Sequence, residues 1–273
     1  MRLLTILSFL FISLNVSAQK PTQVTNSKPK LVVGIVVDQM RWDYINNFKS
    51  FFKTNQGFLK FMNEGASCNN NIIPYVPTVT ACGHTAVYTG AVPAVHGITG
   101  NTWYDNVLQR VVYCTEDASV QSVGVENSTA GKMSPKNVWS TTIGDELKVA
   151  TNFKSKVFGV SLKDRGAIIP AGHAADAAYW YDGATGNWIS STWYMNDLPK
   201  WVKDFNERKW PDHYLSKPWT TTLPLSYYTE SDPDDSPYEL PYTGEAKPVF
   251  PHDLPALRGT SFDLVRRTPF GNT

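Results

Sequence analysis

A threonine at the start of a predicted helix is the residue of this chain best placed for chemistry. Pro74 and Pro77 favour extended backbone before Thr80, and residues 81–89 can form a helix that Gly90 ends. Thr80 is therefore predicted to be the N-cap, with its hydroxyl at the positive end of the helix dipole. That environment favours an alkoxide or a bound phosphate, although a threonine that only caps the helix would show the same pattern.

A carboxylate follows the first apolar run of the chain. Residues 31–37, LVVGIVV, are typical of a strand buried on both faces of a parallel sheet, and Asp38 comes directly after them. Ligands of open α/β sheets bind beyond the carboxyl ends of the strands. Asp38 is therefore predicted to face a ligand site, unless it only caps the helix that follows.

Three more polar residues follow glycine-bearing or strand-like segments. Asn101 ends the loop 97–101, where glycines let backbone approach a ligand, and its amide could donate to a phosphoryl oxygen. Lys163 and Arg165 follow a second apolar run, residues 154–162, and alternate positions on extended backbone point the same way. Two cations there would form a phosphate clamp, and an ordinary turn at each place is the simpler alternative.

The histidines and cysteines do not indicate a metal site of their own. We expect structural roles for His84 and His96. The three cysteines are spread too widely to bind zinc together. Cys68 and Cys114 are the more natural disulfide pair because Cys82 lies on the predicted helix, and three buried thiols are the alternative.

The segments around these residues alternate between helix and strand. Helices are predicted over 42–52, whose apolar stripe should pack on a sheet, over 58–64, and over 134–150, before the strand at 154–162. Residues 177–195 are predicted to form a hairpin of two aromatic-rich strands. This order predicts an α/β fold with a mostly parallel sheet between helices.

Residues 197–256 interrupt that alternation. They are rich in Trp, Pro and acidic residues and contain few periodic runs, which predicts an ordered insertion or cap over the site. Asp232, Asp234 and Asp235 could suggest calcium, but a solvated loop is the preferred interpretation.

Composition and charge limit the partners. The chain of 273 residues is 42% hydrophobic with a formal net charge of +1, so it can bury the core of one large domain. Near-neutral charge gives no reason to expect nucleic acid or an acidic membrane surface as a partner. An anionic substrate would have to be bound by local groups, and the oligomeric state is left open.

The N-terminal residues predict export. Residues 1–18 combine Arg2, an apolar run too short to span a bilayer comfortably, and the small residues of a cleavage site. An uncleaved membrane anchor is the alternative. Residues 19–30 are predicted to form a flexible linker, and the mature protein to be periplasmic or secreted, with no membrane attachment after cleavage.

Four motifs together resemble the alkaline phosphatase superfamily. They are the LVVGIVV run with its Asp, PTVTACGHTAVYTG, VPAVHGITGN and SLKDRG, and they are most similar to the exported PafA-type phosphomonoesterases. The resemblance runs from about residue 30 to the end of the chain. It implies a mostly parallel sheet between helices, two zinc ions at the strand ends, and small phosphate monoesters as substrates.

The resemblance also implies a role for each candidate residue. Asp38 would be a zinc ligand, and Thr80 would be the nucleophile, bound to one zinc ion and phosphorylated during turnover. Asn101, Lys163 and Arg165 match the family's contacts to the substrate phosphate.

The chain departs from the family in the remaining zinc ligands, which are Asp and His residues of the second half of family members. After Thr80 there is no Asp-x-x-x-His or Asp-His pair that matches the family pattern, and His252-Asp253 has the reverse order. Residues 31–273 are therefore expected to be the N-terminal part of a catalytic domain. We expect this part alone to bind zinc weakly and to show little hydrolysis, because hydrolytic zinc sites usually have three protein ligands.

Two other functions fit parts of the pattern. A nucleotide pyrophosphatase/phosphodiesterase of the same superfamily shares the Asp, Thr and Asn, but a singly charged diester gains less from Lys163 and Arg165 than a dianionic monoester does. A non-catalytic exported module that binds phosphate would fit the missing ligands.

Overall fold

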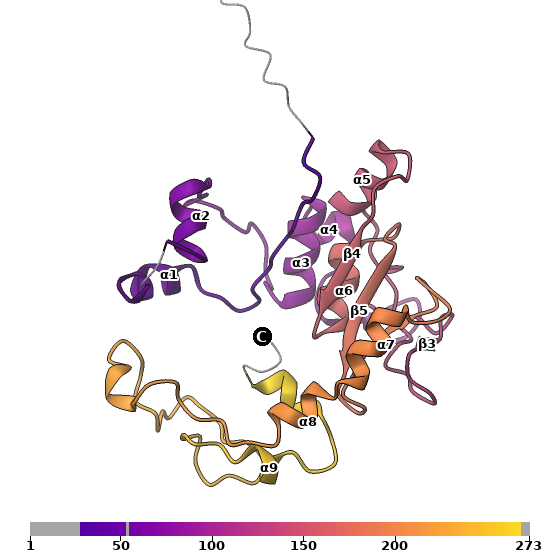
Figure 1. Ribbon diagram of the computed structural model, residues 1–273. Coiled ribbons are helices and arrows are strands. Elements are labelled where there is room, and N and C mark those ends of the chain that lie inside the picture. The colour runs from indigo at the N-terminus through magenta and orange to yellow at the C-terminus, as the bar shows by residue number, and fades with distance from the viewer. Residues whose placement is uncertain (1–27, 53–54, 269–273) are drawn as a thin grey trace, which may run out of the picture. The chain divides into compact units, whose positions relative to one another are not determined.

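The computed structural model describes residues 28–52 and 55–268, and the chain divides into two compact units at the junction of Val37 and Asp38 (Figure 1). The predicted signal peptide, residues 1–18, and most of the predicted linker at 19–30 lie outside the described residues. No helix of the described part is both long and apolar enough to cross a membrane.

The strand predicted at 31–37 does not form. These residues belong to no strand, and their apolar side chains are exposed, from 40% for Val36 to 78% for Leu31. A β-branched run favours extended backbone, but a strand also needs a neighbour that accepts and donates backbone hydrogen bonds. No described strand supplies that neighbour here.

The main sheet of the described residues has four strands in the order β3-β6-β5-β4, and β5 is buried along its whole length. The pair β4–β5 is parallel and the other two pairs are antiparallel, so the sheet is mixed rather than mostly parallel. The predicted hairpin at 177–195 is confirmed as β5 and β6. The strands are β3 Ser122–Val123, β4 Phe158–Ser161, β5 Ala177–Asp182 and β6 Asn187–Ser191.

Helix α6, Asp164–Ala171, connects the parallel strands β4 and β5 and packs on both (Figure 1). Gly159 of β4 makes this packing possible, because an added Cβ would lie 2.1 Å from the carbonyl oxygen of Ala167. Helix α3, Thr80–Thr89, packs on α6 in turn. The candidate residues Thr80 and Arg165 are thus carried by two helices that are in contact.

A two-stranded hairpin follows the loop that ends at Asn101. Strand β1, Thr102–Asp105, pairs antiparallel with β2, Arg110–Tyr113, and the short helix α4, Pro93–His96, precedes them. The backbone N–H of Cys114 donates to the carbonyl oxygen of Asn101 over 3.0 Å. This hairpin therefore brings residues 113–114 next to Asn101.

Two predicted helices need correction. The helix predicted from Ser134 begins only at Ile143, as α5, Ile143–Ala150, because Thr142 and Asp145 form a capping box there. The helix predicted over 42–52 forms as α1, Trp42–Phe48, and the 3₁₀ turn η1, Lys49–Phe51, but neither buries a residue.

The stripe predicted on that first helix therefore does not pack on a sheet in the described residues. Trp42 is 82% exposed, because periodicity indicates an apolar face without specifying what covers it. Helix α2, Phe58–Glu64, ends at Gly65 as predicted and also buries nothing.

The segment predicted to be an insertion contains short helices joined by irregular chain. One isolated bridge pairs Trp219 with His252, and Leu215 and Leu254 pack in one cluster with Tyr181 of β5. The insertion itself stays a prediction. The helices of residues 197–268 are α7 Lys200–Glu207, α8 Trp210–Tyr214, η2 Leu225–Tyr227, α9 Leu254–Leu257 and η3 Asp263–Arg267.

All three cysteines are free thiols, so the predicted pair Cys68–Cys114 is wrong for this structure. Cys82 and Cys114 are buried as the alternative predicted, whereas Cys68 is exposed. Burial is the main reason that the pKa of Cys114 rises to about 12, so this thiol stays protonated at neutral pH.

Candidate functional site

The first residue of α3 makes a hydrogen bond to the carboxylate that sequence analysis paired with it. The Thr80 hydroxyl donates to Asp38 Oδ2 over 3.2 Å. Thr80 is half-buried and Asp38 is exposed, so this pair can be reached from solvent. The N-cap position belongs to Val79, one residue earlier than predicted, and this leaves the Thr80 hydroxyl uninvolved in capping.

The spacing of these two oxygens, 3.2 Å, is close to that of two ligands of one metal ion. Two oxygens at about 2.0–2.2 Å from a tetrahedral zinc ion lie roughly 3.3–3.6 Å from each other. Among residues 28–52 and 55–268, however, no group of three or more His, Cys, Asp or Glu side chains is placed to hold an ion. Asp38 and Thr80 thus fit part of a zinc site, and the described residues do not complete it.

Asn101 lies directly beside the start of α3. Its Oδ1 accepts the backbone N–H of Ala81, the residue after Thr80, over 2.9 Å. A backbone N–H can only donate, so this bond fixes which side of the amide faces the helix. The Nδ2 group is left as a donor with no partner in the described part of the chain, as the predicted contact to a phosphoryl oxygen requires.

Arg165 is held by a short chain of polar side chains. Its Nη1 donates to the Tyr113 hydroxyl over 3.1 Å, and that hydroxyl donates to Asp164 Oδ1 over 3.1 Å. Thr115 donates to the other oxygen of Asp164. Burial first, and then the charge of Asp164, raise the pKa of Tyr113, so its hydroxyl keeps its proton. The Arg165 Nε is buried and has no partner among the described residues.

A small hydrophobic cluster connects the segments that carry Thr80, Asn101 and Arg165. Ala81, Ile98, Cys114 and Ile169 are completely buried in it, and Tyr113 packs against it. The cluster therefore joins the start of α3, the loop before Asn101, the end of β2 and the body of α6. Because protein interiors are closely packed, it fixes the relative positions of the residues on its rim.

Lys163 occupies the N-cap position of α6, on extended backbone, while Arg165 lies in the first turn of the helix. The prediction that both project from one extended segment is therefore wrong, although both stand at the start of α6. The pKa of Lys163 is lowered, first by burial and then by the positive charge of Arg266, against a raising effect of Asp263. The positive charge of Arg165 contributes further to the lowered pKa of Lys163.

The two histidines near Thr80 have structural partners. His84 Nδ1 lies 2.9 Å from the carbonyl oxygen of Thr80, which requires this nitrogen to donate. His96 is completely buried, and its Nδ1 accepts the backbone N–H of Ile98 over 3.1 Å. His84 thus supports the first turn of α3, in agreement with the expected structural role.

The sequence pattern did not indicate Tyr113 as a partner of Arg165, Thr115 as a partner of Asp164, or Arg266 as a neighbour of Lys163. Tyr113 ends a short strand with no local pattern that distinguishes it, and it lies 52 positions from Arg165. Only the pairing of β1 with β2 and the packing of α6 bring these residues together. No sequence signal of the kind used above could have found them.

The family of the chain follows from comparison with known proteins. The model of the type I phosphodiesterase / nucleotide pyrophosphatase family matches residues 32–248, which include all five candidate residues. The chain belongs to this family.

Several relatives show the same resemblance in more detail. Alkaline phosphatase PhoV of Synechococcus elongatus is 51% identical over 249 residues, which are 91% of this chain and 45% of PhoV. Alkaline phosphatase PafA of Elizabethkingia meningoseptica is 49% identical over 269 residues, 98% of this chain and 49% of PafA. A protein of Myroides odoratus named calcium-transporting ATPase is 53% identical over 247 residues, 90% of this chain and 45% of that protein.

A crystal structure of wild-type alkaline phosphatase PafA matches the chain with a TM-score of 0.86 at 51% identity, over 90% of this chain and 47% of the PafA chain. The predicted alkaline phosphatase-like α/β fold and the resemblance to the N-terminal part of PafA-type proteins are confirmed. The chain spans about half the length of the curated relatives it matches.

Proposed function

We propose that the protein containing this chain is an exported, zinc-dependent phosphatase that hydrolyses small phosphate monoesters with Thr80 as the nucleophile. The observation that carries the proposal is the 3.2 Å hydrogen bond from Thr80 to Asp38 at the solvent-accessible start of α3. This bond directs the hydroxyl proton toward the carboxylate, which leaves the lone pairs of Oγ1 for an incoming phosphorus atom.

The surrounding groups suit a phosphate dianion. Asn101 offers a neutral amide donor beside Thr80, and Lys163 and Arg165 provide two positive charges at the start of α6. Arginine binds phosphate through a planar pair of donors, whereas lysine acts as a point charge. In phosphoryl transfer, most of the catalysis comes from positioning and electrostatic stabilisation of this kind.

The reaction has two displacements. Thr80 Oγ1 attacks phosphorus, and a new O–P bond forms as the ester O–P bond breaks and the alcohol leaves. Water then attacks the phosphothreonine from the opposite side, which releases inorganic phosphate and restores the hydroxyl. Lys163, Arg165 and Asn101 hold the non-bridging oxygens in both steps.

Asp38 and Thr80 would be the ligands that this chain contributes to the metal. A bound divalent ion lowers the pKa of a coordinated hydroxyl and neutralises phosphoryl charge. Carboxylate-rich sites also accept other divalent ions, so zinc is proposed here from the family resemblance.

A solved variant of a relative supports the choice of residues. A crystal structure of PafA has been determined with one threonine, one asparagine, one lysine and one arginine substituted, and they are spaced along PafA as Thr80, Asn101, Lys163 and Arg165 are here. The PafA and PhoV names support a phosphatase, since each is called an alkaline phosphatase.

The second candidate is a phosphodiesterase, which the name of the matching family favours. The test compares turnover of p-nitrophenyl phosphate and bis-p-nitrophenyl phosphate by the protein made from its complete reading frame. We expect the monoester to be preferred, and Lys163→Ala and Arg165→Ala each to lower monoester turnover far more than diester turnover. Lys200→Ala, on an 87% exposed side chain of α7, is the matched control.

A preference for the diester, or monoester turnover that survives both substitutions, would refute the monoesterase. A third outcome would identify a binding module: inorganic phosphate bound without added metal, and no turnover of either ester. Export is tested separately, by N-terminal sequencing of the mature protein for cleavage after Ala18.

A further inference from the structure

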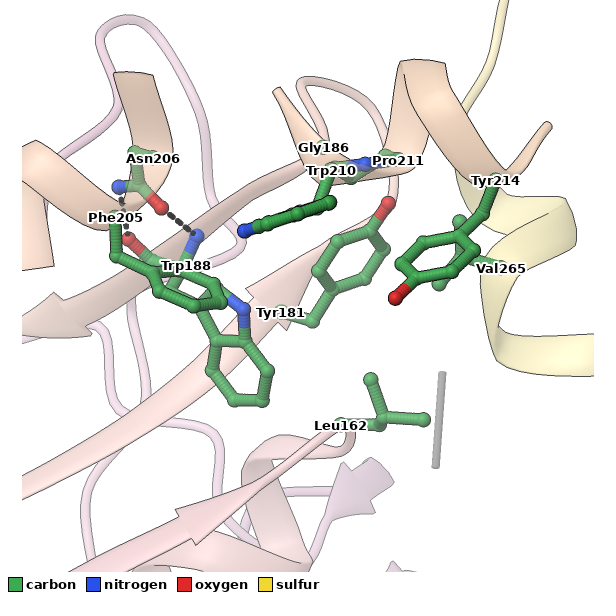
Figure 2. A pocket seen from close by; sticks show the side chains of 10 residues that line it. All are labelled: Leu162, Tyr181, Gly186, Trp188, Phe205, Asn206, Trp210, Pro211, Tyr214 and Val265. Carbon is green, nitrogen blue, oxygen red and sulfur yellow. Dashed lines mark hydrogen bonds between the residues drawn. The ribbon is translucent and has the colours of Figure 1, made fainter. Parts of the chain in front are cut away.

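A cavity of about 210 Å³ lies at the carboxyl end of β4, and Leu162, the residue before Lys163, forms part of its wall (Figure 2). Aromatic side chains make up five of its ten lining residues, and they come from β5, β6, α7 and α8. None of them is a candidate residue of the phosphate site. The cavity is lined by Leu162, Tyr181, Gly186, Trp188, Phe205, Asn206, Trp210, Pro211, Tyr214 and Val265.

The rings are held in fixed orientations. Trp210 stacks on Tyr214 with ring centroids 5.9 Å apart, and Tyr181 meets Trp188 edge to face at 6.2 Å. Figure 2 shows the rings of Tyr181, Trp188 and Trp210 grouped around one space, with Leu162 below them. Such a wall presents ring faces and edges, which favour another aromatic ring over a flexible polar chain.

Two polar groups of the wall, the Tyr181 hydroxyl and the Asn206 amide, are already engaged. The Tyr181 hydroxyl donates to the carbonyl oxygen of Phe262 over 3.1 Å. The Asn206 amide accepts from the backbone N–H of Trp188 over 2.8 Å and donates to its carbonyl oxygen over 2.9 Å. These groups are therefore not offered to a ligand, and the cavity is suited to an apolar group.

Two residues of the cavity wall are chain neighbours of positively charged residues. Leu162 is the chain neighbour of Lys163, and Val265 is the chain neighbour of Arg266. The Arg266 guanidinium lies 5.7 Å from the centre of the Tyr181 ring, and its Nη2 donates to the Tyr181 carbonyl oxygen over 2.6 Å. An apolar cavity with cations at its border matches a molecule with an apolar body and an anionic head.

We propose that this cavity binds the aromatic ring of an aryl phosphate whose phosphate is held by Lys163 and Arg165. An engineered cavity of about 150 Å³ binds benzene, so a cavity of this size holds one ring with small substituents. The inference rests on the proposed phosphate site and adds the class of ester that it prefers.

The test compares phenylphosphonate with methylphosphonate as inhibitors of the protein made from its complete reading frame. Neither phosphonate can lose its organic group by hydrolysis, so the greater reactivity of aryl esters does not affect the result. We expect phenylphosphonate to bind roughly tenfold or more tightly, by competition kinetics and by calorimetry, because the ring leaves water. Trp210→Ala and Phe205→Ala should each reduce the ratio of the two affinities, phenylphosphonate over methylphosphonate, severalfold.

Trp201→Ala is the matched control, since Trp201 is 60% exposed on α7 and does not line the cavity. It should leave the ratio unchanged. Trp210 and Phe205 are each 38% exposed. Two separate variants are made so that the test still stands if one of them does not fold.

Two failures can be told apart. If neither phosphonate nor inorganic phosphate binds, the proposed phosphate site is wrong. If both phosphonates bind equally well, or both cavity substitutions leave the ratio of their affinities unchanged, the phosphate site stands and the cavity proposal is wrong.

Discussion

The hydroxyl of Thr80 and the carboxylate of Asp38 are joined by a hydrogen bond of 3.2 Å across 42 positions of the chain. Nothing in the local sequence around either residue requires this contact. The contact places a hydroxyl group beside a carboxylate that can bind a cation, at the N-terminal end of a helix, where the dipole favours negative charge.

Replacement of the nucleophile gives the most direct test of this pair. Thr80→Ala should lower monoester turnover by at least about a thousandfold, because the reaction loses the atom that accepts the phosphoryl group. Thr80→Ser keeps a hydroxyl and should retain much of the activity. Mass spectrometry after an acid quench should find phosphate on the peptide that contains residue 80 in the wild type and in the serine variant. Unphosphorylated peptide from an active enzyme would contradict the mechanism.

Tyr113 is expected to act by positioning Arg165. Tyr113→Phe removes the hydroxyl that accepts from Arg165 and donates to Asp164. A hydrogen bond to a charged group contributes about 1.5–3 kcal/mol, so kcat/KM for a monoester should fall roughly tenfold. The same substitution should have little effect when Arg165 is already alanine.

The cycle of single and double variants distinguishes this role from general destabilisation, which would lower kcat/KM equally in both backgrounds. Tyr104→Phe is the matched control, because the exposed hydroxyl of Tyr104 contacts only Gln109 at 3.3 Å.

Two glycines should respond to alanine in opposite ways. At Gly159 an added Cβ would lie 2.1 Å from the carbonyl oxygen of Ala167 and 2.9 Å from Ala171 Cβ, so α6 must move away from β4. We expect Gly159→Ala to lower the free energy of unfolding by roughly 2–3 kcal/mol or more. At Gly83, on α3, nothing lies within 4 Å of an added Cβ. Gly83→Ala should therefore raise the free energy of unfolding by about 0.5–1 kcal/mol, because alanine favours a helix more than glycine does.

Urea denaturation of the two variants and the wild type would measure both effects. Equal stability of the Gly159 variant and the wild type would contradict the close packing of α6 on β4, which positions Arg165.

His173 should make stability depend on pH. Its Nδ1 lies 3.3 Å from Asp145 Oδ2 and its Nε2 lies 2.9 Å from the carbonyl oxygen of Val138. Both neighbours are acceptors, so only the doubly protonated ring satisfies both, and the bond to Asp145 is the main cause of a raised pKa. The protonated His173 ring therefore stabilises the folded state fully below its unfolded-state pKa of about 6.5. This stabilisation is lost as the pH rises through the raised pKa of His173 in the folded state.

Urea titrations at several pH values between 6 and 9 should show this fall for the wild type and a flatter profile for His173→Gln. A histidine contribution that grows with rising pH would have the wrong sign for this arrangement.

Local sequence patterns predicted the elements that are stabilised by their own residues. The helix from Thr80 ends at Gly90 as expected, because glycine adopts the left-handed conformation seen there, with φ of 67°. The hairpin of β5 and β6 forms where two aromatic-rich segments and a glycine-containing turn predict it. The same patterns were wrong for 31–37 and for the packing of α1, since both depend on a partner surface elsewhere.

The sequence alone determined which residues to examine: a threonine at a helix start, an aspartate after an apolar run, an asparagine after glycines, and two cations after a strand. Their types and order along the chain are local properties, and they were enough to indicate the family. Tertiary structure decided that Thr80 contacts Asp38, that Tyr113, itself bonded to Asp164, holds Arg165, and that Leu162, the residue before Lys163, lines an aromatic cavity. These relationships join residues far apart in the chain, and local patterns do not specify such contacts. The packing of α3, α6 and the hairpin β1–β2 around one buried cluster, for example, brings Tyr113 to Arg165.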